Sequence, residues 1–289
     1  MRDTPPESTN DGRDSDDELT RPAEPFVSDP QWGAILKGES GDFASGRRFF
    51  RLIPSSPRCK LCSAPFQGFG APVFRMFDRG PWQKNPSICG FCFKQLERAH
   101  GGAEIELTLL FADVRGSTAL AESMGTHAFR GLLDRFYHEM TRVLLAHDAV
   151  IDKFVGDEVV ALFIPALASA DHARRGIEAA RAALRATGHM QPGGPWIPVG
   201  AGVHTGSAYV GTIGDAVTDF TAIGDTVNVT ARLASAAATG EILVSEDTAS
   251  RAGLADASET RTLSLRGRNE PLDVRVLLVE PATAGTTPR

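Results

Sequence analysis

The sequence lacks the features of a membrane, secreted or nucleic-acid-binding protein. No apolar run approaches the ~20 residues needed to span a bilayer, and the acidic N-terminus has no apolar segment of the kind found in secretory signals. Basic residues are not in excess either: the net charge of −6 argues against a general nucleic-acid-binding surface. With 42% hydrophobic residues, the chain can still bury a substantial core. These absences predict a cytoplasmic protein with no membrane span and no nucleic-acid partner.

Composition divides the chain into four regions. Residues 1–25 carry eight acids and three bases and almost nothing to bury, which predicts a disordered acidic tail. Residues 26–100, called the N-terminal module below, contain every cysteine of the chain. Residues 103–280 alternate strand-like and helix-like patterns and are predicted to form the main domain. Residues 281–289 are expected to be a flexible tail.

Cysteine is scarce, but its spacing is informative. The four cysteines form two Cys-x-x-Cys pairs: Cys59, Cys62, Cys89 and Cys92. Two such pairs suit tetrahedral thiolate coordination, so a four-cysteine site for structural zinc is predicted, with an iron–sulfur cluster as the second choice. A redox-active pair is disfavoured because no thioredoxin-like βαβ pattern surrounds either one. A metal would stabilise a region this small, and the module is predicted to regulate the main domain.

The most informative stretch of the main domain is residues 150–164. Two apolar runs flank a Gly-Asp-Glu, as expected for two buried strands joined by a hairpin with Gly156 at the turn and Asp157 at its tip. A second predicted strand, residues 107–112, ends at Asp113. If the two strands are neighbours, both carboxylates converge at one end of the sheet, where Mg²⁺ takes one or two carboxylates together with water and phosphate oxygens. A lone Asp is more often an ordinary turn residue, whereas the pair predicts a two-metal nucleotide site.

A second polar cluster lies on the helix predicted over residues 224–237. Asn228 and Arg232 are four residues apart and therefore share one helical face, and Thr221 lies just before the helix. The arginine fork suits phosphate, and the asparagine amide can donate a hydrogen bond. Because the rest of the helix is largely apolar, this stripe is predicted to face a site. On spacing alone, an Asn/Arg pair on the solvent side fits equally well.

The remaining patterns predict an α+β fold. Helices are predicted over 117–123, from Thr126 onward and over 170–186. Two separate strands, 199–203 and 208–213, are expected to flank residues 204–206. The order of elements contains a ferredoxin-like βαββαβ core. A mostly antiparallel sheet with helices packed on one face is therefore expected.

Four segments of the main domain resemble the catalytic domain of class III nucleotidyl cyclases. They are LLFADVRGST (109–118), KFVGD (153–157), GVHTG (202–206) and TAIGDTVNVTAR (221–232). They occur in the family's order and roughly its spacing, and together they span most of residues 105–280. The resemblance implies a homodimer with two composite sites at its interface, each with two Mg²⁺ or Mn²⁺ ions.

The resemblance also implies a role for each matching residue. Asp113 and Asp157, helped by the Val114 carbonyl, would hold the two divalent ions. The other protomer would supply the remaining groups: Lys153, Thr221, Asn228 and Arg232. The loop that opens the first helix would cradle phosphates with its backbone N–H groups: Val114, Arg115, Gly116 and Ser117. Arg266 or Arg268 would contact the terminal phosphates.

Base choice follows from donor and acceptor chemistry at two of these positions. Lys153 can donate to adenine N1 but clashes with the N1–H of guanine, and Thr221 can accept from the adenine 6-amino group. The prediction is therefore an adenylate cyclase that converts ATP to 3′,5′-cyclic AMP and pyrophosphate. Three alternatives are a catalytically inactive cyclase-like module for nucleotide sensing or dimerisation, a guanylate cyclase, and a GGDEF-type diguanylate cyclase. The last is disfavoured because the second Gly and the Phe of that signature are missing.

Overall fold

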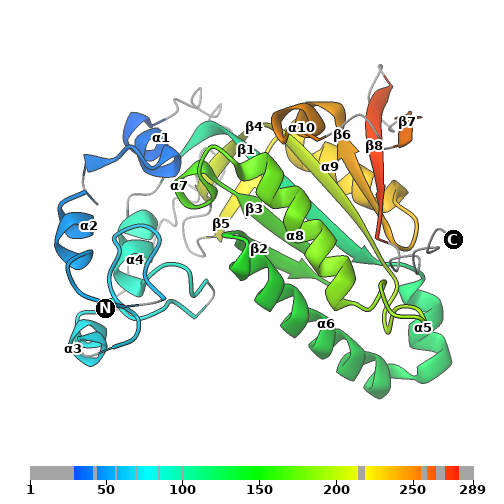
Figure 1. Ribbon diagram of the computed structural model, residues 1–289, viewed down its shortest axis with the longest axis horizontal. Helices are drawn as coiled ribbons and strands as arrows, with labels where there is room; N and C mark the ends of the chain where they lie inside the picture. The colour runs from blue at the N-terminus through cyan, green and yellow to red at the C-terminus, as the bar shows by residue number, and fades with distance from the viewer. Residues whose placement is uncertain are drawn as a thin grey trace, which may run out of the picture.

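The centre of the structure is an eight-stranded sheet in the order β2-β3-β1-β4-β6-β8-β7, with β5 paired to β4 (Figure 1). The pairings are antiparallel except for that of β4 with β6, which is parallel. The strands are β1 (Gly102–Val114), β2 (Val150–Val155), β3 (Glu158–Phe163), β4 (Val199–Ile213), β5 (Asp219–Ile223), β6 (Glu241–Ser245), β7 (Glu259–Leu263) and β8 (Leu272–Leu278). The predicted mostly antiparallel α+β fold is confirmed.

The coordinates are those of a computed structural model, which describes residues 29–264 and 271–279 apart from positions 42–43, 56, 69, 84, 99–100, 214–218 and 255–258. The two predicted tails, and Arg266 and Arg268, lie outside the described residues. Among the helices that the structure describes, none is both long enough and apolar enough to cross a bilayer.

In the main domain the helices connect the strands in the order expected from the sequence, with α7 as an additional short helix, and α1–α4 of the N-terminal module were not predicted. They are α1 (Pro30–Lys37), α2 (Ala44–Phe50), α3 (Ala71–Met76), α4 (Gly90–Arg98), α5 (Ser117–Met124), α6 (Thr126–Ala146), α7 (Pro165–Ala168), α8 (His172–Ala186), α9 (Asp225–Ala236) and α10 (Glu246–Arg251). The run β1-α6-β2-β3-α8-β4 is the predicted βαββαβ core, and its four strands are neighbours in the sheet. This core positions the ends of β1 and β3 side by side.

Helices cover both faces of the sheet, so the expectation of one covered face is wrong. Leu110 and Ala112 of β1 pack in one core cluster with α6 and α8, whereas Leu109 and Phe111 point to the opposite face. On that second face α9 lies so close to β4 that a Cβ on Gly202 would come within 2.4 Å of a backbone nitrogen of α9. The helical spacing of apolar residues predicts a buried side for each helix, but it does not say which face of the sheet receives it.

β4 is one continuous strand of 15 residues, so the predicted interruption at residues 204–206 is wrong. β1 and β4 pair without a break from Gly102↔Gly211 to Val114↔Val199. Gly206 does not end the strand: a Cβ there would lie 2.7 Å from the Thr226 hydroxyl of α9. The glycine permits a close helix–sheet approach, a function that the sequence pattern cannot distinguish from a break.

The N-terminal module packs on the same face of the sheet as α9 and shares a hydrophobic core with it. Trp32 and Leu36 of α1 belong to one cluster of buried side chains with Leu107 and Leu109 of β1. The Trp32 ring also stacks on Phe220 of β5, with the ring centroids 6.3 Å apart. Figure 1 shows the module against the end of the sheet where β5 and the start of β1 lie. The main domain and the module are therefore in direct contact through apolar surface.

Candidate active site

Asp113 and Asp157 lie at the same end of the sheet. Asp113 near the end of β1 lies opposite Glu158, the first residue of β3. The backbone N–H of Val114 donates to the carbonyl of Asp157 with an N···O distance of 3.2 Å. Gly156 provides the turn before Asp157 with a φ of 60°, a conformation that glycine adopts without strain. Asp113 in β1 and Asp157 in the turn before β3 thus lie side by side in the backbone.

Arg115 connects this acidic strand end to α9. Its guanidinium forms an ion pair with the Asp113 carboxylate, and Nη1 donates to the carbonyls of Ser235 at 3.1 Å and Ala237 at 3.4 Å, just beyond Arg232 on α9. Burial lowers the pKa of Arg115, whereas the nearby Asp157 carboxylate opposes this shift. Arg115 is therefore the local counter-ion of the acidic cluster.

The third acid of the cluster responds to the same environment. Burial raises the pKa of Glu158, and the neighbouring Asp157 carboxylate raises it further, while Arg115 lowers it. A like charge and partial desolvation both disfavour the ionised form of a carboxyl group. Added positive charge at this position would relieve that repulsion.

Two of the backbone N–H groups predicted to cradle phosphates, those of Val114 and Arg115, already donate within the fold. The helix α5 begins at Ser117. The residue before it, Gly116, has a φ of 67° and offers no side chain to cap the helix. The backbone N–H of Arg115, however, donates to the carbonyl of Pro198 at 2.8 Å. Arg115 therefore contributes its side chain to the site, while its N–H group is already used within the fold.

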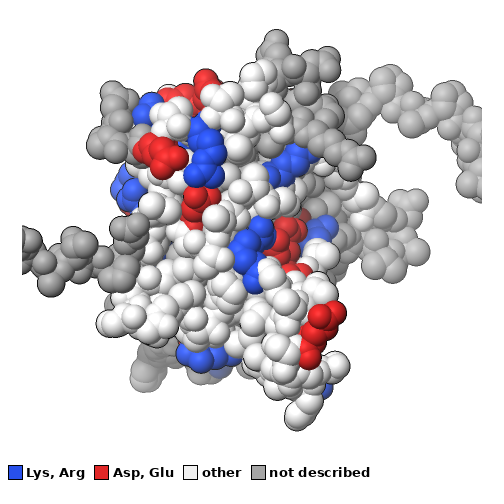
Figure 2. All heavy atoms as spheres, turned by 90° about the vertical axis from the view of Figure 1, so that its right-hand side faces the viewer, with Lys and Arg blue, Asp and Glu red and all other residues white. Residues whose placement is uncertain are grey.

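Charges of both signs are interspersed on the face of the molecule at the α5 end. Figure 2 shows acidic and basic side chains lying beside one another among uncharged residues, and neither sign forms a continuous patch among the described residues of this face. Those residues would therefore balance the negative charge of a nucleotide through individual side chains and bound cations.

Lys153 and Thr221, which are predicted to recognise the base, both contact Asp152, a residue that the sequence analysis did not select. The Thr221 hydroxyl donates to Asp152 Oδ2 at 2.9 Å. Lys153 Nζ lies 3.7 Å from Asp152 Oδ1. The Asp152 side chain is only 4% exposed. In the sequence, Asp152 is an acidic residue within a largely apolar strand. Such a position suggests that the carboxylate has a partner, but it does not identify that partner.

Lys153 and Asp113 lie on the same face of the sheet but some distance apart. Lys153 pairs with Val160, and Val160 pairs with Phe111, two residues before Asp113. Two strand spacings and two residues along a strand place the Lys153 and Asp113 Cα atoms roughly 12 Å apart. One side chain therefore cannot bridge the two groups.

Asn228 and Arg232 share one side of α9, as predicted. Asn228 is exposed and Arg232 is half-buried, while Val229 and Leu233 point into the core. Within the described part of the chain, neither polar side chain forms a hydrogen bond or ion pair. The helix thus presents a cation and an amide that are available to a ligand or to another subunit.

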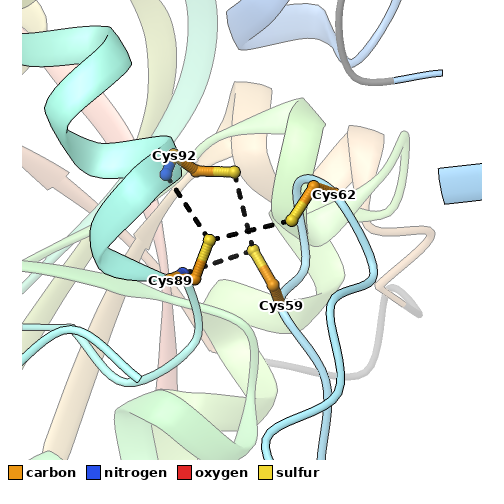
Figure 3. A group of neighbouring side chains, drawn as sticks. All are labelled: Cys59, Cys62, Cys89 and Cys92. Carbon is orange, nitrogen blue, oxygen red and sulfur yellow. Dashed lines mark hydrogen bonds between the residues drawn. The ribbon is translucent and has the colours of Figure 1, made fainter. Parts of the chain in front are cut away.

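The four cysteines converge in the N-terminal module (Figure 3). All are buried, and their four Sγ atoms lie within 4.8 Å of one another. The Sγ atoms of Cys59 and Cys92 are 3.9 Å apart, and those of Cys62 and Cys89 are 3.7 Å apart. Four thiolates around one zinc ion at about 2.3 Å would be about 3.8 Å apart in a regular tetrahedron. The four sulfur atoms are therefore close enough together to surround one metal ion.

The four-cysteine site is tied directly to the main domain. Lys60, inside the first Cys-x-x-Cys pair, forms an ion pair with Asp148, which precedes β2, and Asp148 also pairs with Arg175 of α8. Cys89 and Cys92 lie at the start of α4, whose Phe93 stacks on Trp82 with ring centroids 3.5 Å apart. The four cysteines also belong to one cluster of buried side chains with Leu96 of α4 and Val150 of β2, the strand that carries Lys153.

A cavity of about 750 Å³ lies between the module and β2. Its walls include Trp82 and Phe93 from the module and Asp152, Lys153 and Phe220 from the sheet. Small-molecule sites commonly have volumes of about 300–1,000 Å³ and combine apolar walls with a few polar groups. The cavity is therefore large enough for a nucleotide base and adjoins the residues predicted to recognise one.

Comparison with solved structures identifies the class of fold. The guanylyl cyclase Cya2 superposes with a TM-score of 0.54 and 28% sequence identity, over 61% of this chain and 93% of that one. The adenylyl cyclase CyaB from P. aeruginosa gives a TM-score of 0.53 and 30% identity, over 61% and 95% of the two chains. The fold is that of a nucleotide cyclase catalytic domain.

Sequence comparison identifies the family. Residues 103–275 match the adenylate and guanylate cyclase catalytic domain family. The chain therefore belongs to this family. Adenylate cyclase 1 of Rhizobium meliloti is 32% identical over 155 residues, which are 48% of this chain and 23% of that protein. The adenylate cyclase of Anabaena cylindrica is 34% identical over 132 residues, 44% of this chain and 26% of that one. The chain thus matches only about a quarter of the length of these relatives.

Proposed function

We propose that the protein is an adenylate cyclase that converts ATP to 3′,5′-cyclic AMP and pyrophosphate at composite sites between two identical subunits. The observation that carries this proposal is the adjacent placement of Asp113 and Asp157 at one sheet end, in a chain of the cyclase family. A location with access to ATP, the cytoplasm, is part of the proposal.

Asp113 and Asp157, with the Val114 carbonyl, would hold two Mg²⁺ or Mn²⁺ ions. The donor set fits, because it consists of hard oxygen atoms. Negative charge is already concentrated there: burial, and in addition the Asp157 carboxylate, raise the pKa of the neighbouring Glu158. When bound, such ions lower the pKa of the ribose 3′-hydroxyl and neutralise the triphosphate. Arg115 would give up its ion pair with Asp113 in exchange, and its guanidinium would become available to phosphate oxygens.

The remaining residues would position the substrate and balance its charge. Attack of the 3′-oxygen on the α-phosphorus forms the cyclic phosphodiester and breaks the bond to pyrophosphate. Arg232 would offset the charge that develops on the α-phosphoryl group, and Asn228 would hold the ribose. Because both lie on the available side of α9, they suit a site completed by a second subunit. Lys153 and Thr221 would read the base, and the expected contacts of Arg266 or Arg268 with the terminal phosphates remain part of the proposal.

Guanylate cyclase activity is the second candidate, because a guanylyl cyclase is among the similar solved structures. Lys153 is a donor only, and guanine presents its own N1–H donor at the matching position. A catalytically inactive module is disfavoured, because Asp113, Asp157, Asn228 and Arg232 are all side chains competent for the proposed chemistry. ATP is therefore the preferred substrate.

We further propose that the four-cysteine site binds structural zinc and that the N-terminal module regulates the cyclase domain. Thiolate spacings of 3.7 and 3.9 Å suit one tetrahedral ion. An iron–sulfur cluster would hold its four thiolates farther apart, since several iron atoms lie between them. The ion pair of Lys60 with Asp148, which precedes β2, and the cavity that α4 and β2 line together provide a route by which the module would act on the site.

The function is tested by incubating the purified protein with Mn·ATP and, separately, with Mn·GTP. Cyclic AMP should form from ATP at a rate well above that of the Asp157→Ala variant, with little cyclic GMP and no cyclic dinucleotide. Asp171→Ala is the matched control, because Asp171 is an exposed acid paired with Arg174 on α8. Cyclic AMP production no higher than that of Asp157→Ala would refute the proposed activity.

Tyr137 is expected to support the metal-binding turn. Its hydroxyl donates to the carbonyl of Gly156, directly before Asp157, and its ring packs 4.4 Å from that of Phe154. Tyr137→Phe removes one partly exposed hydrogen bond, which is worth about 0.5–1.5 kcal/mol, so the Mn²⁺ concentration for half-maximal activity should rise about 3- to 10-fold. Tyr209→Phe, the same change at the only other tyrosine, should leave it unaltered. An unchanged Mn²⁺ requirement in Tyr137→Phe would contradict this role.

A further inference from the structure

Asp152 determines how the hydroxyl of Thr221 is oriented. The Thr221 hydroxyl donates its hydrogen to Asp152 Oδ2 at 2.9 Å. An ionised carboxylate can only accept hydrogen bonds, and a hydroxyl has one hydrogen and two lone pairs. Once that hydrogen is committed to Asp152, the lone pairs of Thr221 can only accept from another group. An isolated threonine could act either as donor or as acceptor, and it would therefore discriminate poorly between bases.

A bulge in β2 brings Asp152 to this position. The register of β2 with β3 shifts between Ile151 and Lys153, so Asp152 is the extra residue of the strand. Side chains that follow one another in a regular strand point to opposite faces, whereas a bulge can bring neighbours together. Here the Asp152 carboxylate lies 3.7 Å from Lys153 Nζ while it accepts from Thr221. One buried carboxylate thus contacts both of the residues proposed to read the base.

The adjoining cavity is where this arrangement would meet a ligand. Lys153 and Asp152 form part of its wall, and Thr221 contacts that wall through its hydrogen bond to Asp152. An adenine offers a ring nitrogen acceptor at N1 and an amino donor at C6, whereas a 6-oxo purine offers the reverse pair. A lysine donor beside a threonine that can only accept matches the first pattern and opposes the second.

We propose that Asp152 is a positioning residue for base selection: it fixes the Thr221 hydroxyl as an acceptor and holds Lys153 beside it, so that the pair selects purine nucleotides with a 6-amino group. This inference rests on the proposed cyclase function and adds a residue and a physical basis for its specificity. Asp152 acts through Thr221 and Lys153, because its own side chain is almost fully buried.

The test compares ATP with purine riboside triphosphate, which lacks the 6-amino group and is otherwise the same, and with inosine triphosphate, which carries a 6-oxo group. Wild-type protein should favour ATP over purine riboside triphosphate about tenfold in kcat/KM, the value of one hydrogen bond in a partly buried site. In Asp152→Leu, which removes the acceptor, this preference should fall to about twofold or less, and the discrimination against inosine triphosphate should fall with it. Asp152→Asn keeps one acceptor oxygen and should restore most of the preference.

Thr221→Val provides a second variant of nearly unchanged shape. It should lose the 6-amino preference to the same extent as Asp152→Leu, and the double variant should show no further loss because both changes remove the same contact. Asp171→Asn serves as the control acid-to-amide change on the surface. Equal losses with ATP and purine riboside triphosphate in Asp152→Leu would indicate a structural role only, and an unchanged preference in Thr221→Val would show that the hydroxyl does not read the base; either result overturns the inference.

Failure of the inference and failure of the proposed function give different results. A wild-type protein that forms no cyclic product from any of the three nucleotides refutes the cyclase function. The inference is then decided by calorimetric titration of the same nucleotides, with the same expected ratios in Kd. An active wild-type protein that does not distinguish ATP from purine riboside triphosphate refutes the inference while leaving the cyclase function intact.

Discussion

Asp113→Ala is expected to reduce the rate of cyclic AMP formation by a factor of about a thousand or more. The change removes one of two carboxylates that would hold the divalent cations, and loss of a group that stabilises developing charge typically costs about 10²–10³ in rate before the loss of a bound metal is added. The fold should survive, because Asp113 lies at a strand end and its main partner is Arg115. Activity with Mn·ATP and a thermal unfolding curve together measure the effect.

Mixing two inactive variants tests the composite site directly. Asn228→Ala should also be inactive, but its acidic pair is intact, while Asp113→Ala retains an intact α9. In a two-fold dimer each heterodimer would contain one complete site, so random mixing should restore about a quarter of the wild-type activity. Asp113→Ala mixed with Asp157→Ala should restore nothing, because both variants damage the same half-site. A silent mixture of Asp113→Ala and Asn228→Ala, despite demonstrated subunit exchange, would contradict a shared site.

The placement of the acid pair followed from local sequence rules. Apolar runs around Gly156 predicted the hairpin, and a strand that ends at Asp113 predicted its neighbour. The structure confirms that β1 and β3 are paired. Both predictions depended on short-range patterns whose physical meaning is the same in any fold: alternation, a glycine turn and a polar residue after a buried strand. Contacts between side chains that are distant in the sequence could be identified only from the structure.

Three features could not be predicted from the sequence: the contact of Asp152 with Thr221, the contact of Arg115 with α9, and the covering of both faces of the sheet. Asp152 meets Thr221 only because β5 folds back against β2, a contact between residues 69 positions apart. Arg115 reaches the end of α9, 120 positions away. Periodicity assigns a buried side to each helix but does not choose between the two faces of a sheet that is apolar on both. Gly206 was misread for a related reason, since its purpose lies in the approach of a distant helix.

The second large effect is expected from loss of the four-cysteine site. Cys62→Ser, or a strong chelator applied to the wild-type protein, should remove about one bound zinc per chain. A four-thiolate site contributes its binding free energy to folding, and binding free energies of about 10–16 kcal/mol are typical of zinc-finger peptides. Even a third of this would lower the midpoint of thermal unfolding by about 10 °C in a domain of this size.

Loss of the metal should affect the whole chain, because the module and the sheet share a core. The four cysteines belong to the same buried cluster as Ile105, Leu107 and Leu109 of β1, and Lys60 pairs with Asp148 before β2. Zinc content, thermal unfolding and the KM for ATP should therefore all change together in Cys62→Ser. Lys60→Ala should keep its zinc and shift KM alone, since it breaks only the ion pair with Asp148, next to the start of β2.

Met76→Ser is the control for the serine substitution, because Met76 is 85% exposed on α3 and should change none of the three measurements. A brown chromophore in the wild-type protein would show that the four cysteines hold an iron–sulfur cluster and not zinc. If Cys62→Ser loses its metal but keeps both its unfolding midpoint and its KM, the four-cysteine site would be energetically independent of the cyclase domain. That result would contradict the proposed regulation. A close-packed core transmits strain, so loss of a buried four-thiolate site should loosen the sheet that packs against it.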